Sequence, residues 1–560
     1  MNAYWYSRFR YPCPRPDRLF LTMVAEKRRF YGPAPGRGMD YGIRGLAYWG
    51  RPYRRIRLCG TCFRLSSLPI CRILIQLMIA DLIARHWELL DALAAVIGLI
   101  VYVAASQALH QRRHPSAAIA WVMAIVLLPF LALPLYLVFG TRKIAPRRPR
   151  SVPIGDVPSP ARQTTAAQAQ RLAQAMGLPP PAAYTHLTIH ADGAQALDAL
   201  RRLIDGATQT LEVCTFLFGR DALGDEIGER LKAKARAGVR VRLLVDGVGV
   251  YMGGGLPDLR SLRAAGVEAR VFVSLFRSSL RGRTNLRNHR KSVIADGRHF
   301  WCGGRNLAAE YFVGGYGVLG QQVYRQLHRR APPPWLDLSF DLEGDLARQA
   351  QEVFMQDWAF AGESAPTEEY APAQANAVQG PPPTLPGLAQ MVVSGPDLAD
   401  DTIHTLLISS CFTARRRILA ITPYFVPDPA LLNAMTLAAR RGVAVDLVMP
   451  VRSNHRIADF VRHRALRELA AAGGRVWLHP QMVHAKALVF DDEMALAGSA
   501  NLDGRSLFIN YEMMIGFYDG MAVRGFSAWI EARRKEADAY VVQRPHVVRN
   551  VAEGLLLWLA

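Results

Sequence analysis

The stretch His289-Arg-Lys-Ser-Val-Ile-Ala-Asp296 returns later in the chain as His484-Ala-Lys-Ala-Leu-Val-Phe-Asp491. Both stretches read H-x-K-x4-D, and a chain with 14 His, 7 Lys and 28 Asp is expected to contain about 0.009 such matches by chance. Arginine outnumbers lysine 61 to 7, so two motif lysines indicate a compact ammonium group at a specific point. The repeat predicts two similar halves.

The surroundings of the two motifs are duplicated as well. Each motif is followed at the same offset by a small-residue turn and Asn, in 303–306 and 498–501. Upstream, 235–246 aligns with 439–450 as a helix end, a glycine at the C-cap and an apolar strand, and each copy follows another strand. This alternation predicts an α/β fold with halves at 185–358 and 391–560, joined by a Pro- and Gln-rich linker at 359–390.

The spacing of each motif suits phosphate chemistry. Side chains at i and i+2 of a strand share a face, so each His projects with its Lys while Val483, Ala485, Ala487 and Val489 cover the other face. Lysine then meets a phosphate oxygen, and the turn residues donate hydrogen bonds to the same group. A lone H-x-K is usually a surface pair, but two complete copies favour a site. The candidate phosphate-binding residues are Asn306, Ser499 and Asn501.

Two uncharged apolar runs precede the duplicated part. Residues 92–109 and 117–140 each reach the roughly 18–20 residues that cross a bilayer. Neither run carries the polar stripe of a buried core helix, so we expect a transmembrane hairpin over 78–145 with spans at about 89–109 and 117–140. Five basic residues in 142–150 follow the hairpin and two lie between the spans, which predicts a cytoplasmic catalytic part.

The net charge of +22 excludes neither nucleic acid nor an anionic membrane as a partner, but its location favours the membrane. The excess is +12 in residues 1–77, +5 in 78–150 and +5 in the remaining 410 residues. We expect 1–77 to be a disordered basic extension, with Met78 as a possible true start, and 146–184 to be a linker. Seven scattered cysteines indicate a reducing compartment, and the single CxxC at 59–62 lacks further zinc ligands.

Together these features resemble the phospholipase D superfamily, and more narrowly the bacterial cardiolipin synthases. The resemblance covers roughly residues 85–555. Besides the two motifs and the paired spans, it rests on short segments elsewhere in the chain: Trp335-x-Asp337, Phe354-x-x-Asp357-Trp358, Ser394-Gly-Pro396, Tyr424-Phe-x-Pro427, Asn501-Leu-Asp-x-Arg-Ser506 and Asn510-Tyr-Glu512.

The resemblance implies one site formed by both halves, in which one histidine attacks phosphorus and the other protonates the departing alcohol. His289 is then the nucleophile and His484 the acid and later base, while Lys291, Lys486, Asn306 and Asn501 neutralise the transition state. Glu512 in the second half and Asp337 in the first are the candidates to orient the rings. Asp296 and Asp491 have the opposite strand parity, so we expect structural or orienting roles. No metal and no cofactor is required.

The implied substrate is phosphatidylglycerol, of which two molecules give cardiolipin and glycerol at a bacterial inner membrane. Five arginines near the first motif are candidates to receive anionic headgroups, with a solvated basic loop as the alternative: Arg277, Arg281, Arg283, Arg287 and Arg290. A membrane-bound phospholipase D hydrolase shares every motif and stays open. A nuclease and a non-catalytic scaffold are disfavoured, and the oligomeric state is left undetermined.

Overall fold

The structure is a computed structural model that describes residues 86–108, 115–140, 143, 164–252, 258–274, 284–314, 333–362, 387–543 and 545–556. The expected N-terminal extension at 1–77, Met78 and the loop at 109–114 lie outside these residues, as do residues 363–386 of the expected second linker. Arg277, Arg281 and Arg283 also lie outside them.

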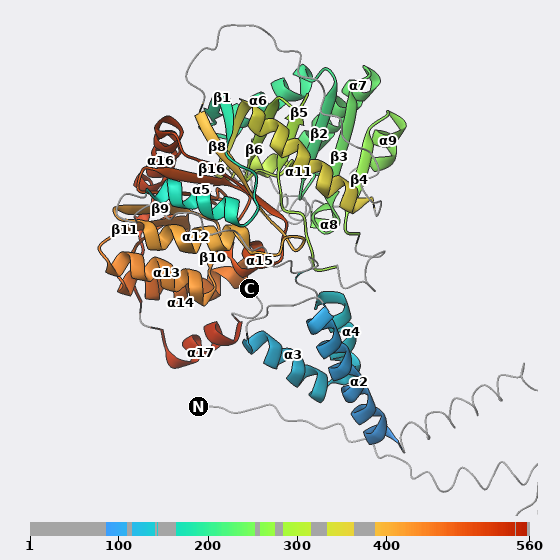
Figure 1. The fold of residues 1–560 in the computed structure, drawn as a ribbon, viewed down its shortest axis with the longest axis vertical. Coiled ribbons are helices and arrows are strands. Elements are labelled where there is room, and N and C mark those ends of the chain that lie inside the picture. The colour runs from blue at the N-terminus through green and yellow to red at the C-terminus, as the bar shows by residue number, and fades with distance from the viewer. Residues whose placement is uncertain are drawn as a thin grey trace, which may run out of the picture. The chain divides into compact units, whose positions relative to one another are not determined.

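The first half alternates strands and helices from Ala182 to Ala361 (Figure 1). Its elements in chain order are β1 (Ala182–Ile189), α6 (Gly193–Gly206), β2 (Thr210–Thr215), α7 (Ala222–Arg236), β3 (Arg240–Asp246), α8 (Gly249–Met252), α9 (Leu259–Ala264), β4 (Glu268–Phe272), β5 (Ser292–Ala295), β6 (His299–Gly303), the 3-10 turn η5 (Ala309–Tyr311), β7 (Ser339–Gly344) and α11 (Asp345–Ala361).

The second half repeats this succession and adds a C-terminal helix. Its elements are β8 (Gly387–Ser394), α12 (Thr402–Thr413), β9 (Arg417–Ile421), β10 (Phe425–Val426), α13 (Pro429–Arg440), β11 (Ala444–Pro450), α14 (Arg456–Ala471), β12 (Arg475–His479), β13 (Ala487–Phe490), β14 (Met494–Gly498), β15 (Leu502–Asp503), α15 (Gly504–Phe508), β16 (Glu512–Phe517), α16 (Gly520–Lys535), β17 (Asp538–Ala539) and α17 (Val547–Leu556).

One sheet runs through both halves. Its order is β4-β3-β2-β5-β6-β7-β1 in the first half and β8-β16-β14-β13-β9-β11-β12-β17 in the second. The seam is the antiparallel pair of β1 and β8, in which Ala182 faces Ala389. Read outward from this seam, equivalent strands follow in the same order on both sides. The two α/β halves predicted from the duplicated motif are therefore confirmed, and the sheet joins them edge to edge.

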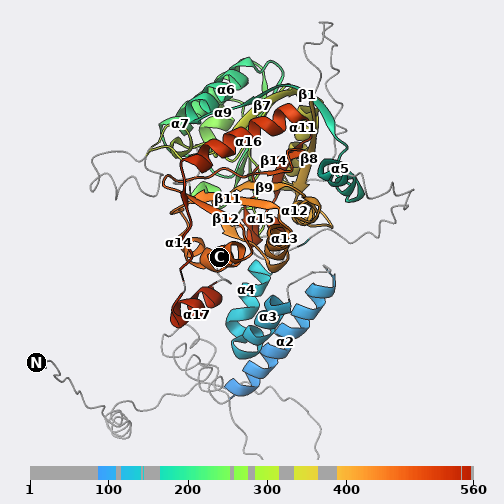
Figure 2. The ribbon, with the colours of Figure 1, turned by 90° about the vertical axis from the view of Figure 1, so that its left-hand side faces the viewer.

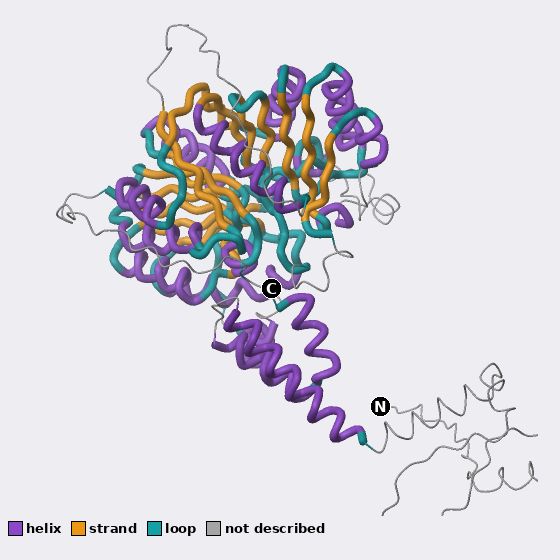
Figure 3. Tube along the Cα trace, turned by 45° about the vertical axis from the view of Figure 1, so that its right-hand side comes forward, coloured by secondary structure: helices purple, strands orange, loops and turns teal. Residues whose placement is uncertain are grey.

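Helices cover both faces of this sheet, which Figure 3 shows as a band of strands between helices. β2, β3 and β4 are parallel neighbours, as are β9, β11 and β12, so each connection needs a helical crossover. α11 packs along the strands of the first half, and α16 packs along those of the second. The helices α12, α13 and α14 of the second half pack against one another in sequence order (Figure 2).

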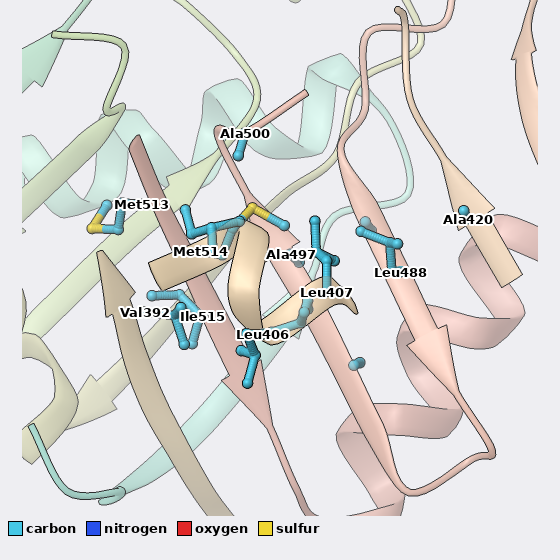
Figure 4. Packing of buried hydrophobic residues seen from close by; sticks show 14 of the residues in the cluster. Val392, Leu406, Leu407, Ala420, Leu488, Ala497, Ala500, Met513, Met514 and Ile515 are labelled. Carbon is cyan, nitrogen blue, oxygen red and sulfur yellow. The ribbon is translucent and has the colours of Figure 1, made fainter. Parts of the chain in front are cut away.

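The core of the second half lies between these layers. Met513 and Met514 are neighbours on β16 and point to opposite faces of the sheet, as strand periodicity requires. On the face beneath α12, Leu406 and Leu407 pack with side chains from β8, β13, β14 and β16 (Figure 4). The labelled residues of this cluster are at most 3% exposed.

Part of the expected linker at 146–184 belongs to the folded body. Residues 165–175 form α5 (Thr165–Ala175), capped by the Thr164 side chain. Small residues at helical spacing, Thr165, Ala169 and Ala173, are buried, and α5 packs against α12. The prediction of a linker is wrong for this stretch, because alanines four residues apart allow a helix to approach its neighbour closely.

The N-terminal apolar runs form helices, but only one is long enough to cross a membrane within the described residues. Trp87–Ala105 of α2 (Trp87–Ala108) has a mean hydropathy of 2.1 and only 11% of its residues are buried. The second predicted span is divided into α3 (Pro115–Leu127) and α4 (Pro129–Phe139). The break occurs because Pro129 has no N–H to continue the helix and restricts Leu128, whose ψ of 58° is not helical. The two-span hairpin stays a prediction.

Candidate active site

The two H-x-K pairs lie immediately before strands rather than within them. Lys291 precedes β5 and Lys486 precedes β13, and these strands run antiparallel to β2 and β9, their neighbours on the side away from the seam. The start of β5 therefore lies at the carboxyl end of β2, and the start of β13 at that of β9. This is the end of an α/β sheet where ligands usually bind. Val483 and Ala485, expected on the opposite face from the histidine, are fully buried.

Each motif is held by the main chain of the other half. The His289 N–H donates to the Tyr511 carbonyl at 2.9 Å, and the Tyr511 N–H donates to the Arg287 carbonyl at 2.8 Å. In the reverse direction, the His484 N–H donates to the Leu336 carbonyl at 2.7 Å. These reciprocal bridges bring the two motifs into a single site.

The carboxylate that faces His289 comes from the second half. Glu512, at the start of β16, places its two oxygens 3.0 and 3.1 Å from His289 Nδ1. An ionised carboxylate only accepts hydrogen bonds, so Nδ1 carries the proton and Nε2 keeps its lone pair. Ser499 Oγ donates to Glu512 at 2.6 Å and Asn510 Nδ2 donates at 3.1 Å, which fixes the carboxylate in turn.

The carboxylate that faces His484 comes from the first half. Asp337 Oδ2 accepts from His484 Nδ1 at 2.7 Å, while its Oδ1 accepts from the Leu338 N–H at 2.7 Å. Both carboxylates are completely buried. The pairing is therefore crossed: each half supplies the group that orients the histidine of the other half. Neither half contains a complete set.

Gly304 and Ser499 occupy equivalent positions, and they explain why one half uses an aspartate and the other a glutamate. The Gly304 N–H donates to the Leu338 carbonyl, as the Ser499 N–H does to the Met513 carbonyl. A Cβ on Gly304 would lie 2.2 Å from Asp337 Oδ1. The shorter Asp337 needs this vacant space, whereas the longer Glu512 reaches a serine hydroxyl. Ser499, expected to bind phosphate, instead directs its proton to Glu512.

Both motif lysines are buried beside the histidines. Lys291 Nζ donates to the His289 carbonyl at 2.6 Å, and Lys486 Nζ lies 2.8 Å from His484 Nδ1 and 3.0 Å from its Nε2. Burial lowers the pKa of Lys291 to about 8 and that of Lys486 to about 7, despite the opposing charges of Glu512 and Asp337. The site therefore holds ammonium groups that titrate near neutrality.

The histidines respond to the same environment. Burial lowers the pKa of His289, with Glu512 opposing it and the charges of Lys291 and Lys486 adding to it. Burial and Lys486 lower the pKa of His484 to about 3. Burial raises the pKa of Asp337, but His484 and Lys486 outweigh burial and bring that pKa to about 2. Both imidazoles are thus neutral and both carboxylates ionised before a substrate binds.

The two candidate asparagines differ in their partners. Asn306 Oδ1 accepts from the Leu217 N–H at 3.3 Å and its Nδ2 donates to Tyr311 Oη at 2.8 Å, so its amide is engaged within the first half. Asn501 is 5% exposed, and its Oδ1 has no hydrogen-bond partner within the part of the chain that the structure describes. Of the two, Asn501 is the less engaged, and a phosphate oxygen would have to bind its Nδ2, because Oδ1 only accepts hydrogen bonds.

The two motif aspartates lie at the far ends of β5 and β13, away from the histidines. Asp296 accepts from the backbone N–H groups of 208–210, and Asp491 accepts from those of 415–417. Both adopt positive φ, at 55° and 53°. They tie each motif strand to the chain that enters β2 or β9, which agrees with a structural role.

Two of the five arginines expected to attract headgroups are buried. Arg287 Nη1 donates to the Val273 carbonyl at 3.0 Å and lies 3.5 Å from Asp246 Oδ1. Arg290 Nη1 donates to Asp357 Oδ1 at 2.6 Å, and both side chains are at most 4% exposed. The expectation that these two receive lipid headgroups is wrong, because their charges are already neutralised inside the protein.

Aromatic walls around the histidines were not predicted from the sequence. The Phe216 ring lies edge-on 5.1 Å from the His289 ring, and Tyr311 lies 5.1 Å and Trp335 5.5 Å from the His484 ring. Only two of these rings could have been suspected from their place in the sequence, because Phe216 directly follows the strand β2 and Trp335 lies two residues before Asp337. Across the described ranges, no group of three His, Cys, Asp or Glu side chains converges as a metal site would.

Comparisons relate the chain to several known proteins. The family described as "Cardiolipin synthase, PLD-like domain" matches residues 200–317 and 407–534, and "Phospholipase_D-nuclease N-terminal" matches 93–140. Cardiolipin synthase A of Pseudomonas aeruginosa is 31% identical over 79% of this chain and 88% of its own length. That of Pseudomonas putida is 32% identical over 79% and 90%. A phosphatidylserine synthase structure from Haemophilus influenzae aligns with 69% of this chain and 97% of its own, at 14% identity and a TM-score of 0.48.

Proposed function

Because the chain belongs to the bacterial cardiolipin synthases of the phospholipase D superfamily, we propose that it transfers a phosphatidyl group between two phosphatidylglycerol molecules. The products are cardiolipin and glycerol. The observation that carries this proposal is the crossed site, in which His289 and His484 each depend on a carboxylate of the other half. Two oriented imidazoles in one site suit a displacement that needs a nucleophile and an acid.

In the first step, His289 Nε2 attacks the phosphorus of the donor lipid. The N–P bond forms as the bond from phosphorus to the headgroup glycerol oxygen breaks, and His484 gives a proton to that oxygen so that glycerol leaves. His289 suits the nucleophile because its side chain is 13% exposed against 5% for His484. Glu512 holds its Nδ1 proton and stabilises the positive charge that develops on the ring.

In the second step, a glycerol hydroxyl of another phosphatidylglycerol attacks the same phosphorus. The N–P bond breaks, His484 takes the hydroxyl proton, and the free His289 is restored. The negative charge of the bound phosphodiester raises the pKa of His484 and of both lysines, so His484 Nε2 takes up a proton from solvent before the first step. Lys291, Lys486 and Asn501 stabilise the charge on the equatorial oxygens, with Asn306 supporting the wall beside them.

The chain is proposed to work as a multi-pass protein of the bacterial inner membrane. The relatives it matches are cardiolipin synthases, and α2 provides one helix of sufficient length and apolar character. The basic residues at 142–150 outnumber those at 112–113, which supports a cytoplasmic catalytic part.

The test is the full chain purified in detergent with phosphatidylglycerol as the sole lipid. We expect glycerol release in equal amount to cardiolipin, both followed by mass spectrometry. Phosphatidic acid without cardiolipin would instead identify a hydrolase.

His289→Ala and His484→Ala should each abolish cardiolipin formation. The matched control is His299→Ala on β6, whose side chain is 45% exposed and far less constrained, and which should retain activity. Unchanged activity in either motif variant would refute the mechanism.

A further inference from the structure

The C-terminal helix α17 is turned the opposite way from an ordinary surface helix. Its acidic residue faces the protein: Glu553 is fully buried and accepts from Arg467 at 2.5 Å and from Arg549 at 3.0 Å. Three of its valines face outward, with Val547 80%, Val548 81% and Val551 56% exposed. A helix that folded only for the protein interior would bury this stripe instead.

The exposed stripe is a continuous face of α17. Val547 and Val551 are four residues apart, and Val548 lies beside them on the same side of the helix. Val541 and Val542, in the segment that leads into α17, are 74% and 53% exposed. Five exposed valines within eleven residues form a patch that needs an apolar partner.

The surroundings of the patch are basic. Arg549 is 40% exposed and holds its guanidinium over the Phe460 ring at 5.9 Å. The neighbouring α14 and the loop before it carry further exposed cations: Arg452, Arg456 and Arg464. Apolar side chains bordered by arginine suit the interface of an anionic bilayer, where valine enters the acyl boundary and arginine meets lipid phosphate.

The patch is also connected to the active site. Leu556 at the end of α17 packs against the cluster of Val426, Ala458 and Val461, and β10 pairs with β15 so that Phe425 faces Leu502. Leu502 directly follows Asn501, the asparagine with an unengaged Oδ1. α17 is therefore linked to the turn that carries Asn501 through this cluster and the β10–β15 ladder.

We propose that α17 is a membrane-surface helix, whose Val547, Val548 and Val551 insert into the headgroup region of an anionic bilayer and hold the catalytic unit against its lipid substrate. This rests on the proposed function, since it takes the bilayer as the source of phosphatidylglycerol. An anionic bilayer is the partner that suits this patch, because basic residues border it and α2 of the same chain exposes a further apolar surface.

The test places a fluorophore on the patch and reads lipid contact without reference to activity. Val548→Cys is labelled with an environment-sensitive dye in a full-length chain whose Cys13, Cys59, Cys62 and Cys71 are serine, since Cys214, Cys302 and Cys411 are buried. The matched control is Met521→Cys on α16, which is 78% exposed. Both proteins are reconstituted into vesicles of phosphatidylglycerol or of phosphatidylcholine.

We expect quenching by lipids with spin-labelled acyl chains at position 548 and none at 521, stronger in phosphatidylglycerol than in phosphatidylcholine. Absence of quenching at 548 would overturn the proposal. The dye at 548 could instead report an apolar environment in dilute lipid-poor micelles, with a response that rises with protein concentration. That result would show that a second copy covers the patch, and it would also overturn the proposal.

A second measurement separates this proposal from the proposed function. Val548→Glu should lower the rate of cardiolipin formation several-fold in phosphatidylglycerol vesicles and leave it unchanged with detergent-dispersed lipid, whereas Met521→Glu should change neither. Equal rates in vesicles would overturn the docking role. Failure of every variant and of the parent to form cardiolipin would refute the function alone, because the quenching result does not depend on it.

Discussion

At the scale of single residues, Gly304 determines whether Asp337 can orient His484. A methyl group at this position would lie 2.2 Å from Asp337 Oδ1, so the carboxylate must move. We expect Gly304→Ala to cost about 1–3 kcal/mol through overpacking. Since the displaced carboxylate accepts from His484 Nδ1, the ring of the proposed acid, kcat should fall about tenfold to hundredfold.

The control for this substitution is Gly228→Ala on α7, where an added Cβ meets nothing within 4 Å. Removing a glycine from a helix interior stabilises it by about 0.8–1 kcal/mol, so this variant should be as active as the parent and slightly more stable. The measurements are steady-state rates and thermal unfolding of both proteins. A fully active Gly304→Ala would contradict the role assigned to Asp337.

A second residue-scale prediction concerns pH. Burial lowers the pKa of Lys486 to about 7 and that of Lys291 to about 8. A lysine with a lowered pKa loses its charge as the pH rises through that value, so kcat/KM, which reports the free enzyme, should fall on the alkaline side between about pH 7 and 8.

Lys486→Arg should move this alkaline limb to higher pH while reducing the maximal rate, because a guanidinium stays charged but differs in shape from an ammonium. Lys535→Arg at the exposed end of α16 should leave the profile as it is. The same limb in the parent and in Lys486→Arg would show that Lys486 does not cause it.

At the scale of elements, a buried ion pair connects four segments behind the site. Arg290 Nη1 donates to Asp357 of α11, its Nε donates to the Glu512 carbonyl at 3.2 Å and its Nη2 donates to the Ser394 carbonyl at 3.2 Å. Asn288 Nδ2 donates to the same aspartate at 2.8 Å. The pair thus joins the first motif, α11, β8 and β16 across the seam between the halves.

Asp357→Ala should lower the free energy of unfolding by about 3–5 kcal/mol, because it leaves Arg290 buried without a counter-charge. Denaturant titration measures this loss. Asp345→Ala is the matched control, since its partner Arg348 is on the same helix and the two side chains are 58% and 48% exposed. This surface pair should contribute about 0–1 kcal/mol. Similar losses in both variants would contradict the bridging role.

At the scale of the whole molecule, membrane topology is open to a direct test. If the catalytic part is cytoplasmic, Met521→Cys should resist a membrane-impermeant maleimide in intact spheroplasts and react after lysis. Met521 is 78% exposed, so folding alone would not protect it. Labelling in intact spheroplasts would place the catalytic part on the outer side of the membrane and reverse the orientation predicted from the flanking arginines.

The sequence by itself determined the duplication, the α/β class and the two H-x-K pairs, because these are local patterns of identity and spacing. It also identified Glu512 and Asp337 as candidates to orient the rings. The order of strands within each half and the helix α5 could not be predicted from the sequence, because they depend on which apolar faces pack together. The alanine-rich composition around Ala169 suits a linker and a closely packed helix equally.

Only the tertiary structure decided the crossed pairing, in which Glu512 faces His289 and Asp337 faces His484. It likewise turned Arg287 and Arg290 inward, although their sequence neighbours suggest a basic surface loop. The physical reason is the seam between β1 and β8, which joins the two halves in one sheet and brings the start of each motif strand against the chain of the other half. Contacts between residues more than a hundred positions apart leave no periodicity in the sequence, whereas each motif lies within eight consecutive residues.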